Sequence, residues 1–177
     1  MNPPLPDILP LEPYLREIVW GGRRLQDFGK DLPPDVPIGE SFEVSALPEQ
    51  DSIVRSGPMC GLGLRQGLTR YGEEFVGAAI TARYGDDFPL LIKLIDAQDD
   101  LSIQVHPDDV YARAEGLGRF GKTEAWFVLR SDGSRLALGL QEGADQGTLR
   151  QALTEDRAED VVLYQDVGED DVVFLKA

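Results

Sequence analysis

The sequence has little of what supports disulfide, metal or nucleic-acid chemistry. Its 177 residues include one cysteine and one histidine, and 17 basic residues stand against 32 acidic ones, which gives a net charge of −15. Because Cys60 has no partner for an internal disulfide and no charged-then-apolar leader begins the chain, we expect a reducing, cytoplasmic location. The acidic balance argues against nucleic acid and anionic membranes as partners. No apolar run approaches the ~20 residues of a membrane helix.

Regular alternation of helices and strands is also missing, and this favours a mainly β fold. Alternating or apolar segments predict strands over 16–20, 41–46, 51–55, 88–96, 101–106, 122–129, 135–140, 161–167 and 172–175. Short helices are expected over 23–28, 64–76, 109–114 and 148–153. Many short strands with few helices predict an antiparallel barrel or jelly roll. The length predicts a single domain over residues 1–177.

Three of these strands carry more specific expectations. The segment 88–96 is the most apolar run and predicts a central strand, with Lys93 as its one charge to explain. The segment 41–46 alternates like a strand with one buried face, and 51–55 is its expected partner.

Polar side chains gather on one face of two predicted strands. Successive side chains of a strand point to opposite faces. Ser102, Gln104 and His106 therefore share one face, and the apolar residues that alternate with them lie on the other. The same alternation places Lys122 and Glu124 on one face of the next strand. The two strands can therefore direct a hydroxyl, an amide, an imidazole, an ammonium and a carboxylate into one cavity.

This group of side chains has a plain interpretation and a chemical one. A lone histidine in a strand is more often a structural residue than a metal ligand, and Lys122 can simply pair with Glu124 or a nearby aspartate. Against this, Gln104 offers an oxygen, His106 a nitrogen and Glu124 an anionic oxygen, a mixture that suits zinc. Asp108 and Asp109 are expected to cap the helix that follows, because acidic residues favour its positive end.

Several separated motifs, in the same order, resemble type I mannose-6-phosphate isomerase (phosphomannose isomerase), a zinc enzyme with a cupin fold. They are the runs 18–22, 38–45, 89–97, 101–109 and 121–124, and the resemblance covers nearly the whole chain. It implies a cupin-type barrel, a sugar phosphate as the small-molecule partner, and the interconversion of mannose 6-phosphate and fructose 6-phosphate through an enediol. In that family the Trp20-Gly21-Gly22 turn opens the fold, although a packed aromatic beside a turn explains it equally well.

The resemblance also implies roles for individual residues. Gln104, His106 and Glu124 match zinc ligands, whereas Ser102 and Lys122 match residues that contact the substrate near its phosphate. Enediol chemistry needs an acid or base and a positive charge for the developing oxyanion. With the one histidine committed to metal, the proton carrier is a lysine, a carboxylate or bound water, and Lys122 is the expected one. The expected local cations for the phosphate are Lys93, Arg119 and Lys122.

This chain departs from the family in one respect. Family members continue past the strand at 172–175 to a second histidine ligand, further strands and a basic phosphate-binding residue, and this sequence holds no other histidine. We therefore expect a fragment of a longer isomerase, or else a shortened relative, with weak zinc binding and little turnover.

Two other functions compete with the isomerase. One is a non-catalytic cupin-type module that binds a sugar phosphate. The other is an iron dioxygenase, which is disfavoured because such sites use two histidines and a carboxylate. The sequence leaves the oligomeric state open.

Overall fold

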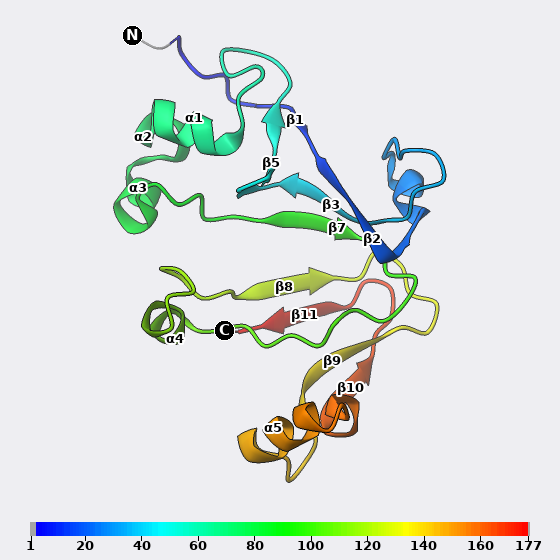
Figure 1. The fold of residues 1–177 in the computed structure, drawn as a ribbon. Coiled ribbons are helices and arrows are strands. Elements are labelled where there is room, and N and C mark those ends of the chain that lie inside the picture. Colours follow the sequence, from blue (N-terminus) through cyan, green and yellow to red (C-terminus); the bar gives the residue numbers. More distant parts are fainter. Residues whose placement is uncertain (1–2, 177) are drawn as a thin grey trace. The chain divides into compact units, whose positions relative to one another are not determined.

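The computed structural model describes residues 3–176, and the chain forms two compact units. Unit 1 is Met1–Leu101 and unit 2 is Ser102–Ala177. Unit 1 holds strands β1 to β7 and helices α1 to α3, and unit 2 holds α4, α5 and β8 to β11 (Figure 1). The single domain expected over residues 1–177 stays a prediction.

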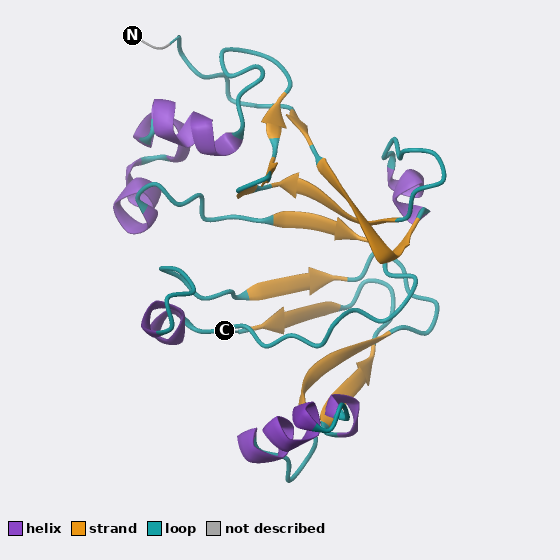
Figure 2. Cartoon of the chain, viewed as in Figure 1, coloured by secondary structure: helices purple, strands orange, loops and turns teal. Residues whose placement is uncertain are grey.

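Unit 1 is organised around one three-stranded antiparallel sheet, in the order β2-β3-β7 (Figure 2). Its strands are β1 (Leu11–Glu12), β2 (Tyr14–Gly22), β3 (Ile38–Val44), β4 (Ala46–Leu47), β5 (Gln50–Asp51), β6 (Ile53–Val54) and β7 (Ile92–Ile95). Its helices are the 3₁₀ helix η1 (Arg24–Phe28), α1 (Leu64–Tyr71), α2 (Glu73–Val76) and α3 (Ala78–Tyr84). Two further antiparallel pairs join β1 with β6 and β4 with β5.

Strand β3 is the centre of this sheet, and both of its faces are buried. Ile38 and Phe42 are each 2% exposed on one face, while Ser41 on the other is 0% exposed. The expectation of one solvated face is therefore wrong, since Ser41 and Ser45 on the polar face are as deeply buried as Phe42 on the apolar face. The serines stay compatible with burial since their polar atoms are paired; Ser45, just beyond β3, donates its backbone N–H to Ser52 Oγ at 2.9 Å.

One expectation about this sheet is corrected and another is confirmed in part. Strand β7 pairs only with β3 among the described strands, so the apolar run 88–96 yields an edge strand, and only over Ile92–Ile95. The segment 51–55 is in part the expected partner of 41–46: Ala46 of β4 pairs with Asp51 of β5, and the Ser52 N–H donates to Ser45 O at 2.8 Å. Its remaining strand residues form β6, which pairs with β1 instead.

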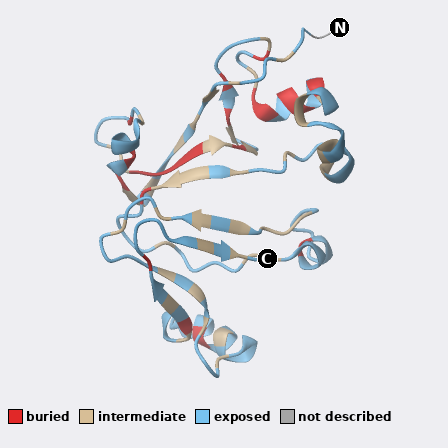
Figure 3. Cartoon of the chain, turned by 180° about the vertical axis from the view of Figure 1, so that it is seen from behind, coloured by how far each residue is buried: buried red, intermediate tan, exposed pale blue. Residues whose placement is uncertain are grey.

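Helix α1 packs against a core cluster of unit 1 and is shorter than expected. The cluster consists of Val54, Met59, Leu64 and Tyr71. The helix predicted over 64–76 stops at Tyr71, because Gly72 adopts φ 52° and ψ −120°, a conformation that other residues rarely reach. The chain continues as α2 and α3. Figure 3 shows the buried residues of unit 1 concentrated on β3 and α1.

Unit 2 consists of two antiparallel strand pairs with short helices. Strand β8 (Glu124–Phe127) pairs with β11 (Val172–Leu175), and β9 (Arg135–Leu140) pairs with β10 (Val162–Asp166). The helices are α4 (Asp109–Ala114), α5 (Gln146–Thr154) and the 3₁₀ helix η2 (Ala158–Asp160). The strands predicted over 135–140, 161–167 and 172–175 and the helices predicted over 109–114 and 148–153 are confirmed.

The strand predicted over 101–106 is wrong. This segment is assigned no strand and forms no ladder with another described strand. Its apolar alternation does not cover a core within the unit, since Val105 is 80% exposed and Ile103 is 38% exposed. Alternation requires a partner strand before it becomes a sheet, and the sequence does not show whether one exists.

The mainly β, antiparallel class is confirmed, but the strands of residues 3–176 form five separate sheets and no closed barrel. Among the helices in this part of the chain, none combines the length and the apolarity needed to cross a membrane.

Candidate active site

Three side chains of unit 2 converge at the start of β8. His106 Nε2 lies 2.9 Å from Glu124 Oε2, and Lys122 Nζ lies 2.7 Å from Glu124 Oε1. Lys122 Nζ is also 3.2 Å from His106 Nε2, so the three groups form a triangle. The side chains of His106 and Glu124 are 19% and 18% exposed, while that of Lys122 is 43% exposed. The sequence predicted that these residues share a cavity, and the structure brings them together.

Strand β8 fixes the direction of the carboxylate. Glu124 is its first residue and pairs with Leu175 of β11, and Trp126 pairs with Val173. Because the period of a strand is two, Trp126 lies on the same face as Glu124, and its indole Nε1 donates to Glu124 Oε2 at 3.4 Å. Glu124 Oε2 therefore faces both the imidazole and the indole, and Oε1 faces the ammonium.

A close backbone approach places Lys122 beside His106. The backbone N–H of Lys122 donates to Pro107 O at 3.1 Å. A Cβ on Gly121 would lie 2.3 Å from that same oxygen and 2.7 Å from the carbonyl carbon of Asp108, so only glycine fits between these backbones. The residue after His106 and the residue before Lys122 are thus held in direct contact.

The two aspartates that follow Pro107 have different tasks. Asp108 caps α4, with its Oδ1 accepting the backbone N–H of Tyr111 at 2.7 Å. Asp109 Oδ1 accepts the N–H of Gly121 at 2.7 Å. The expectation that both residues cap the helix is correct for Asp108 only, because the carboxylate of Asp109 binds the neighbouring loop.

The electrostatics of the triangle favour a charged carboxylate. Partial burial by itself raises the pKa of Glu124, but the hydrogen bond and positive charge of Lys122, together with His106 and Trp126, outweigh it and bring the pKa below its ordinary value. A carboxylate that stays ionised can hold a cation or accept a hydrogen bond.

Ser102 and Gln104 lie on the same extended segment as His106 but outside the triangle. The amide nitrogen of Gln104 donates to Ser102 Oγ at 2.8 Å, and both residues are exposed. In the described part of the chain, no group of three or more histidine, cysteine, aspartate or glutamate residues is placed to hold a metal ion. Within these residues, a group close in sequence that could add a neutral oxygen to the donor atoms of His106 and Glu124 is the side-chain amide of Gln104.

The remaining expected cations already have neighbours. Lys93, in unit 1, donates to Glu40 Oε1 at 2.6 Å, and its Nζ lies 5.2 Å from the centre of the Phe42 ring. The guanidinium of Arg119 lies over the ring of Phe120 at 5.2 Å. Asp109 and Gly121 also shape the site, and the sequence did not predict this, because no residue pattern indicates that the start of α4 contacts the segment before Lys122.

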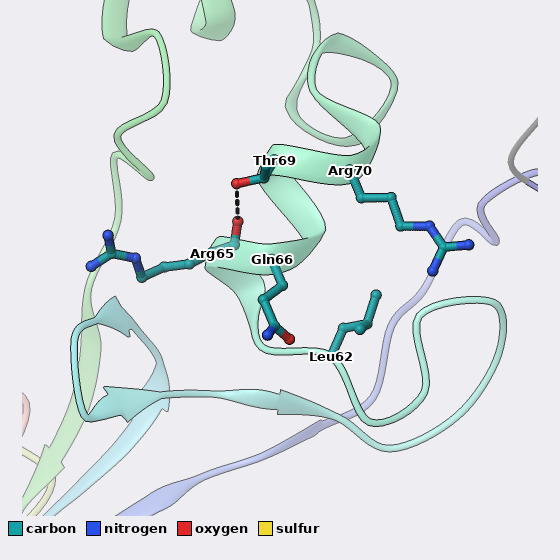
Figure 4. A pocket seen from close by; sticks show the side chains of 5 residues that line it. All are labelled: Leu62, Arg65, Gln66, Thr69 and Arg70. Atoms are coloured by element: carbon teal, nitrogen blue, oxygen red, sulfur yellow. Dashed lines mark hydrogen bonds between the residues drawn. The ribbon is translucent and has the colours of Figure 1, made fainter.

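The hollow drawn in Figure 4 lies on α1 in unit 1, and no residue of the triangle lines it. It has a volume of about 440 Å³ and is lined by Leu62, Arg65, Gln66, Thr69 and Arg70. Its two arginine side chains extend to opposite sides (Figure 4), so their charges do not converge on one point. The hollow also lacks a carboxylate or an imidazole, and the triangle in unit 2 is the stronger candidate for an active site.

Comparison with known proteins finds similarity to mannose-6-phosphate isomerases. The model of the type I phosphomannose isomerase catalytic domain matches residues 8–120. The probable mannose-6-phosphate isomerase GmuF of Bacillus subtilis is 43% identical over 131 residues, which cover 73% of this chain and 40% of that protein. The mannose-6-phosphate isomerase of Streptococcus mutans is 37% identical over 145 residues, covering 81% of this chain and 43% of that protein.

Solved structures agree with the fold. The crystal structure of the mannose 6-phosphate isomerase from Bacillus subtilis matches with a TM-score of 0.78 and 32% identity, over 93% of this chain and 51% of that one. A putative mannosephosphate isomerase from Archaeoglobus fulgidus matches in fold with a TM-score of 0.75 at 23% identity, over 97% of this chain and 57% of that one. The chain spans about 40% of the length of the curated relatives described above.

Proposed function

Because the chain belongs to the type I phosphomannose isomerase family, we propose that it contributes to the interconversion of mannose 6-phosphate and fructose 6-phosphate. The observation that carries this proposal is the triangle of His106, Lys122 and Glu124, with every edge at 3.2 Å or less. It combines an ammonium, an imidazole and an ionised carboxylate at one point, which are the groups that proton transfer next to a carbonyl requires.

The reaction moves one proton between carbons and needs no external oxidant. A base removes the proton from C2 of the open-chain aldose, an enediol forms, and a proton returns to C1 while the hydroxyl proton moves from O2 to O1. We assign Lys122 the proton-transfer role: its ammonium, held 2.7 Å from Glu124 Oε1, can donate a proton to the substrate, and the neutral amine that remains can accept one. The Lys122 side chain is 43% exposed, which leaves it accessible to a ligand. Ser102, on the segment leading to His106, and Lys122 are the proposed contacts to the substrate near its phosphate.

The donor set fits a zinc ion in chemical type. His106 Nε2 and Glu124 Oε2 converge to 2.9 Å, and zinc accepts imidazole nitrogen and carboxylate oxygen. The residues proposed to hold the ion are Gln104, His106 and Glu124. When bound, zinc supplies a Lewis acid that polarises a carbonyl or hydroxyl oxygen. Trp126 has a separate task in this arrangement: its indole N–H keeps the carboxylate of Glu124 oriented.

A second function, binding of a sugar phosphate without turnover, is favoured by a specific observation. Lys122 Nζ lies 2.7 Å from Glu124 Oε1, so the ammonium has a counter-ion, and a fixed positive charge can bind a phosphate without taking part in proton transfer. A pocket that binds the sugar phosphate through Ser102 and Lys122 alone does not need the carboxylate of Glu124 to remain ionised.

Substitution of Glu124 by Gln separates the two functions. In a coupled assay for fructose 6-phosphate, E124Q is expected to lower turnover on the order of 100-fold or more, because it removes the charge that organises His106 and Lys122. Zinc content after dialysis against a chelator is expected to fall in parallel. The matched control is Glu142→Gln, a change at an exposed glutamate of the same unit, which should leave both values unchanged.

The binding function predicts the opposite pattern. A chain that binds mannose 6-phosphate saturably, turns none of it over and binds it equally well as E124Q would contradict the isomerase proposal. Calorimetric titration with mannose 6-phosphate measures this directly on the 177-residue chain.

A further inference from the structure

The first turn of α4 is attached to the loop that carries Lys122. Asp109 is its first residue, yet its side chain does not serve the helix, because Asp108 already supplies the cap. Instead Asp109 Oδ1 accepts the N–H of Gly121 at 2.7 Å, twelve residues further along the chain. The Asp109 carboxylate therefore joins the first turn of α4 to the loop that precedes Lys122.

This contact is one of a set that closes the loop 115–121 onto α4. The Lys122 N–H donates to Pro107 O at 3.1 Å, and the Leu117 N–H donates to Ala112 O at 2.9 Å. Arg113 completes the set: its Nη1 donates to Arg119 O at 3.0 Å and lies 3.9 Å from Asp109 Oδ2. The carboxylate of Asp109 is thus directed by Arg113 on one oxygen and binds the Gly121 N–H with the other.

The bond adds to the contacts that hold Lys122, whose own N–H is bonded to Pro107 O. Strand β8 begins at Glu124, so the sheet does not fix Lys122, and its four-carbon stem has many rotamers to lose. Because Gly121 is held against Pro107 and Asp108, the Cα of Lys122, from which its side chain starts, lies close to His106. A carboxylate-to-amide bond is well suited to this, because hydrogen bonds with an ionised partner are about twice as strong as neutral ones.

We propose that Asp109 is a positioning residue: through the Gly121 N–H it holds the Lys122 ammonium against His106 and Glu124. The structural part of this proposal stands on the contacts alone. Its consequence for turnover rests on the proposed isomerase function.

Three variants of the full chain test it. Asp109→Ala removes the acceptor, and since the Asp109 side chain is 54% exposed, no cavity results. Asp109→Asn keeps an acceptor oxygen and should restore the contact. Asp108→Ala is the matched control, because it removes the cap of the same helix and leaves the Gly121 N–H bonded. If the alanine variant fails to fold, Asp109→Ser replaces it, with a hydroxyl too short to reach Gly121.

Nuclear magnetic resonance supplies a readout that does not depend on activity. His106 is the single histidine of the chain, so its ring signals are unambiguous. We expect the nuclear Overhauser contact between the Lys122 ε-methylene and the His106 ring to be lost in D109A and kept in D109N and D108A. Hydrogen exchange at the Gly121 amide should accelerate about tenfold in D109A, the factor that corresponds to one hydrogen bond with a charged group.

A D109A variant that keeps the contact between Lys122 and His106 would overturn the proposal, as would a D108A variant that loses it to the same extent. The isomerase assay is scored separately: D109A should lower kcat about tenfold and raise KM, because Lys122 is also a proposed substrate contact, and D109N should restore both values. If the parent chain shows no turnover, the proposed function fails while the resonance data still decide the role of Asp109.

Discussion

Tyr71 is a buried tyrosine whose hydroxyl has no hydrogen-bond partner among the described residues. Its side chain is 6% exposed and packs in the cluster with Val54, Met59 and Leu64. Other buried polar groups in unit 1 are paired; Asp96, for example, accepts the Arg24 N–H at 2.7 Å and the Gln98 amide at 2.8 Å. An unpaired buried hydroxyl keeps its desolvation cost without a compensating bond.

Substitution of Tyr71 by Phe should therefore leave the free energy of unfolding unchanged or raise it by about 1 kcal/mol. Urea denaturation followed by circular dichroism measures this difference. The matched control is Tyr14→Phe at a residue that is 37% exposed, where we expect a change within about 0.5 kcal/mol. A loss of more than about 1 kcal/mol in Y71F would mean that the hydroxyl is satisfied in solution.

Glu40 is a buried carboxylate whose ion pairs make unit 1 sensitive to acid. Burial by itself raises the pKa of Glu40, but hydrogen bonds from Lys93 at 2.6 Å and Arg16 at 2.7 Å outweigh it, and the net pKa lies below its ordinary value. The native state therefore binds fewer protons than the unfolded state. The resulting stability is complete above the unfolded pKa and is lost as the pH falls through the lower folded pKa.

Replacing Glu40 by Gln should lower the free energy of unfolding at neutral pH by about 1–3 kcal/mol, because two cations lose their partner. The difference between E40Q and the parent should shrink as the pH falls below the ordinary titration range of a glutamate, because the lowered pKa keeps the carboxylate of the parent ionised through that range. Denaturation at several pH values measures this convergence. Glu17→Gln, on the exposed face of β2, is the control; a difference for E40Q that does not depend on pH would contradict the ion-pair account.

Only some of the side-chain contacts in the candidate active site could be predicted from the sequence. The grouping of Lys122 and Glu124 with His106 could be predicted from the family that their two motifs resemble, although the strand alternation invoked for it is wrong, since residues 101–106 form no strand and β8 begins at Glu124. The bond from Asp109 to Gly121 could not be predicted, since it joins loops whose approach depends on a carbonyl at Pro107. Whether Gln104 and Ser102 serve the site stays a prediction, because their side chains bond to each other.

At the scale of elements, β2 and β3 approach each other through two glycines. A Cβ on Gly21 would lie 2.3 Å from Gly39 N and 2.7 Å from Ile38 C, and a Cβ on Gly39 would lie 2.5 Å from Trp20 Cζ3. The indole of Trp20 thus packs over Gly39, and the backbone of β3 packs against Gly21. This supports the simpler of the two interpretations of the Trp20-Gly21-Gly22 motif, a packed aromatic beside a close approach.

Gly21→Ala should destabilise the chain by about 1–3 kcal/mol, because the atoms that its Cβ meets are backbone atoms and cannot rotate away. Thermal and urea denaturation measure the loss. Gly168→Ala is the control, since the nearest atom to its added Cβ is Asp171 Oδ2 at 3.8 Å. Equal stability of G21A and the parent would show that β2 and β3 can separate without cost.

Elements whose signals are local could be predicted, and those that depend on neighbours could not. Helix α4 follows from Pro107 and its acidic cap, and α5 from its apolar spacing. Helix α3 was missed because Gly77 at its start offers no side-chain cap and none of its residues is buried. The segment 101–106 alternates but has no ladder partner, and the apolar run at 88–96 does not distinguish a central strand from an edge.

At the scale of the molecule, the two units differ in how much apolar surface each one buries. Unit 1 holds the large buried side chains, among them Ile38, Phe42, Met59 and Leu68, each at most 5% exposed. The buried hydrophobic residues of unit 2 are Ala112, Ala152, Val162 and Val167. Buried apolar area drives folding, so unit 1 should contribute the larger share of the stability.

Native-state hydrogen exchange on the full chain should resolve this difference residue by residue. We expect amides of β3 to exchange at least about tenfold more slowly than amides of β8 and β11, because local opening requires less free energy where few apolar contacts are broken. Both sets of amides lie in antiparallel ladders, so each serves as the control for hydrogen bonding alone. The ratio should fall in Gly21→Ala, which loosens β3, and remain in Gly168→Ala. Equal exchange in β3 and β8 would mean that the chain opens as one cooperative body, in which case burial within each unit does not set its stability.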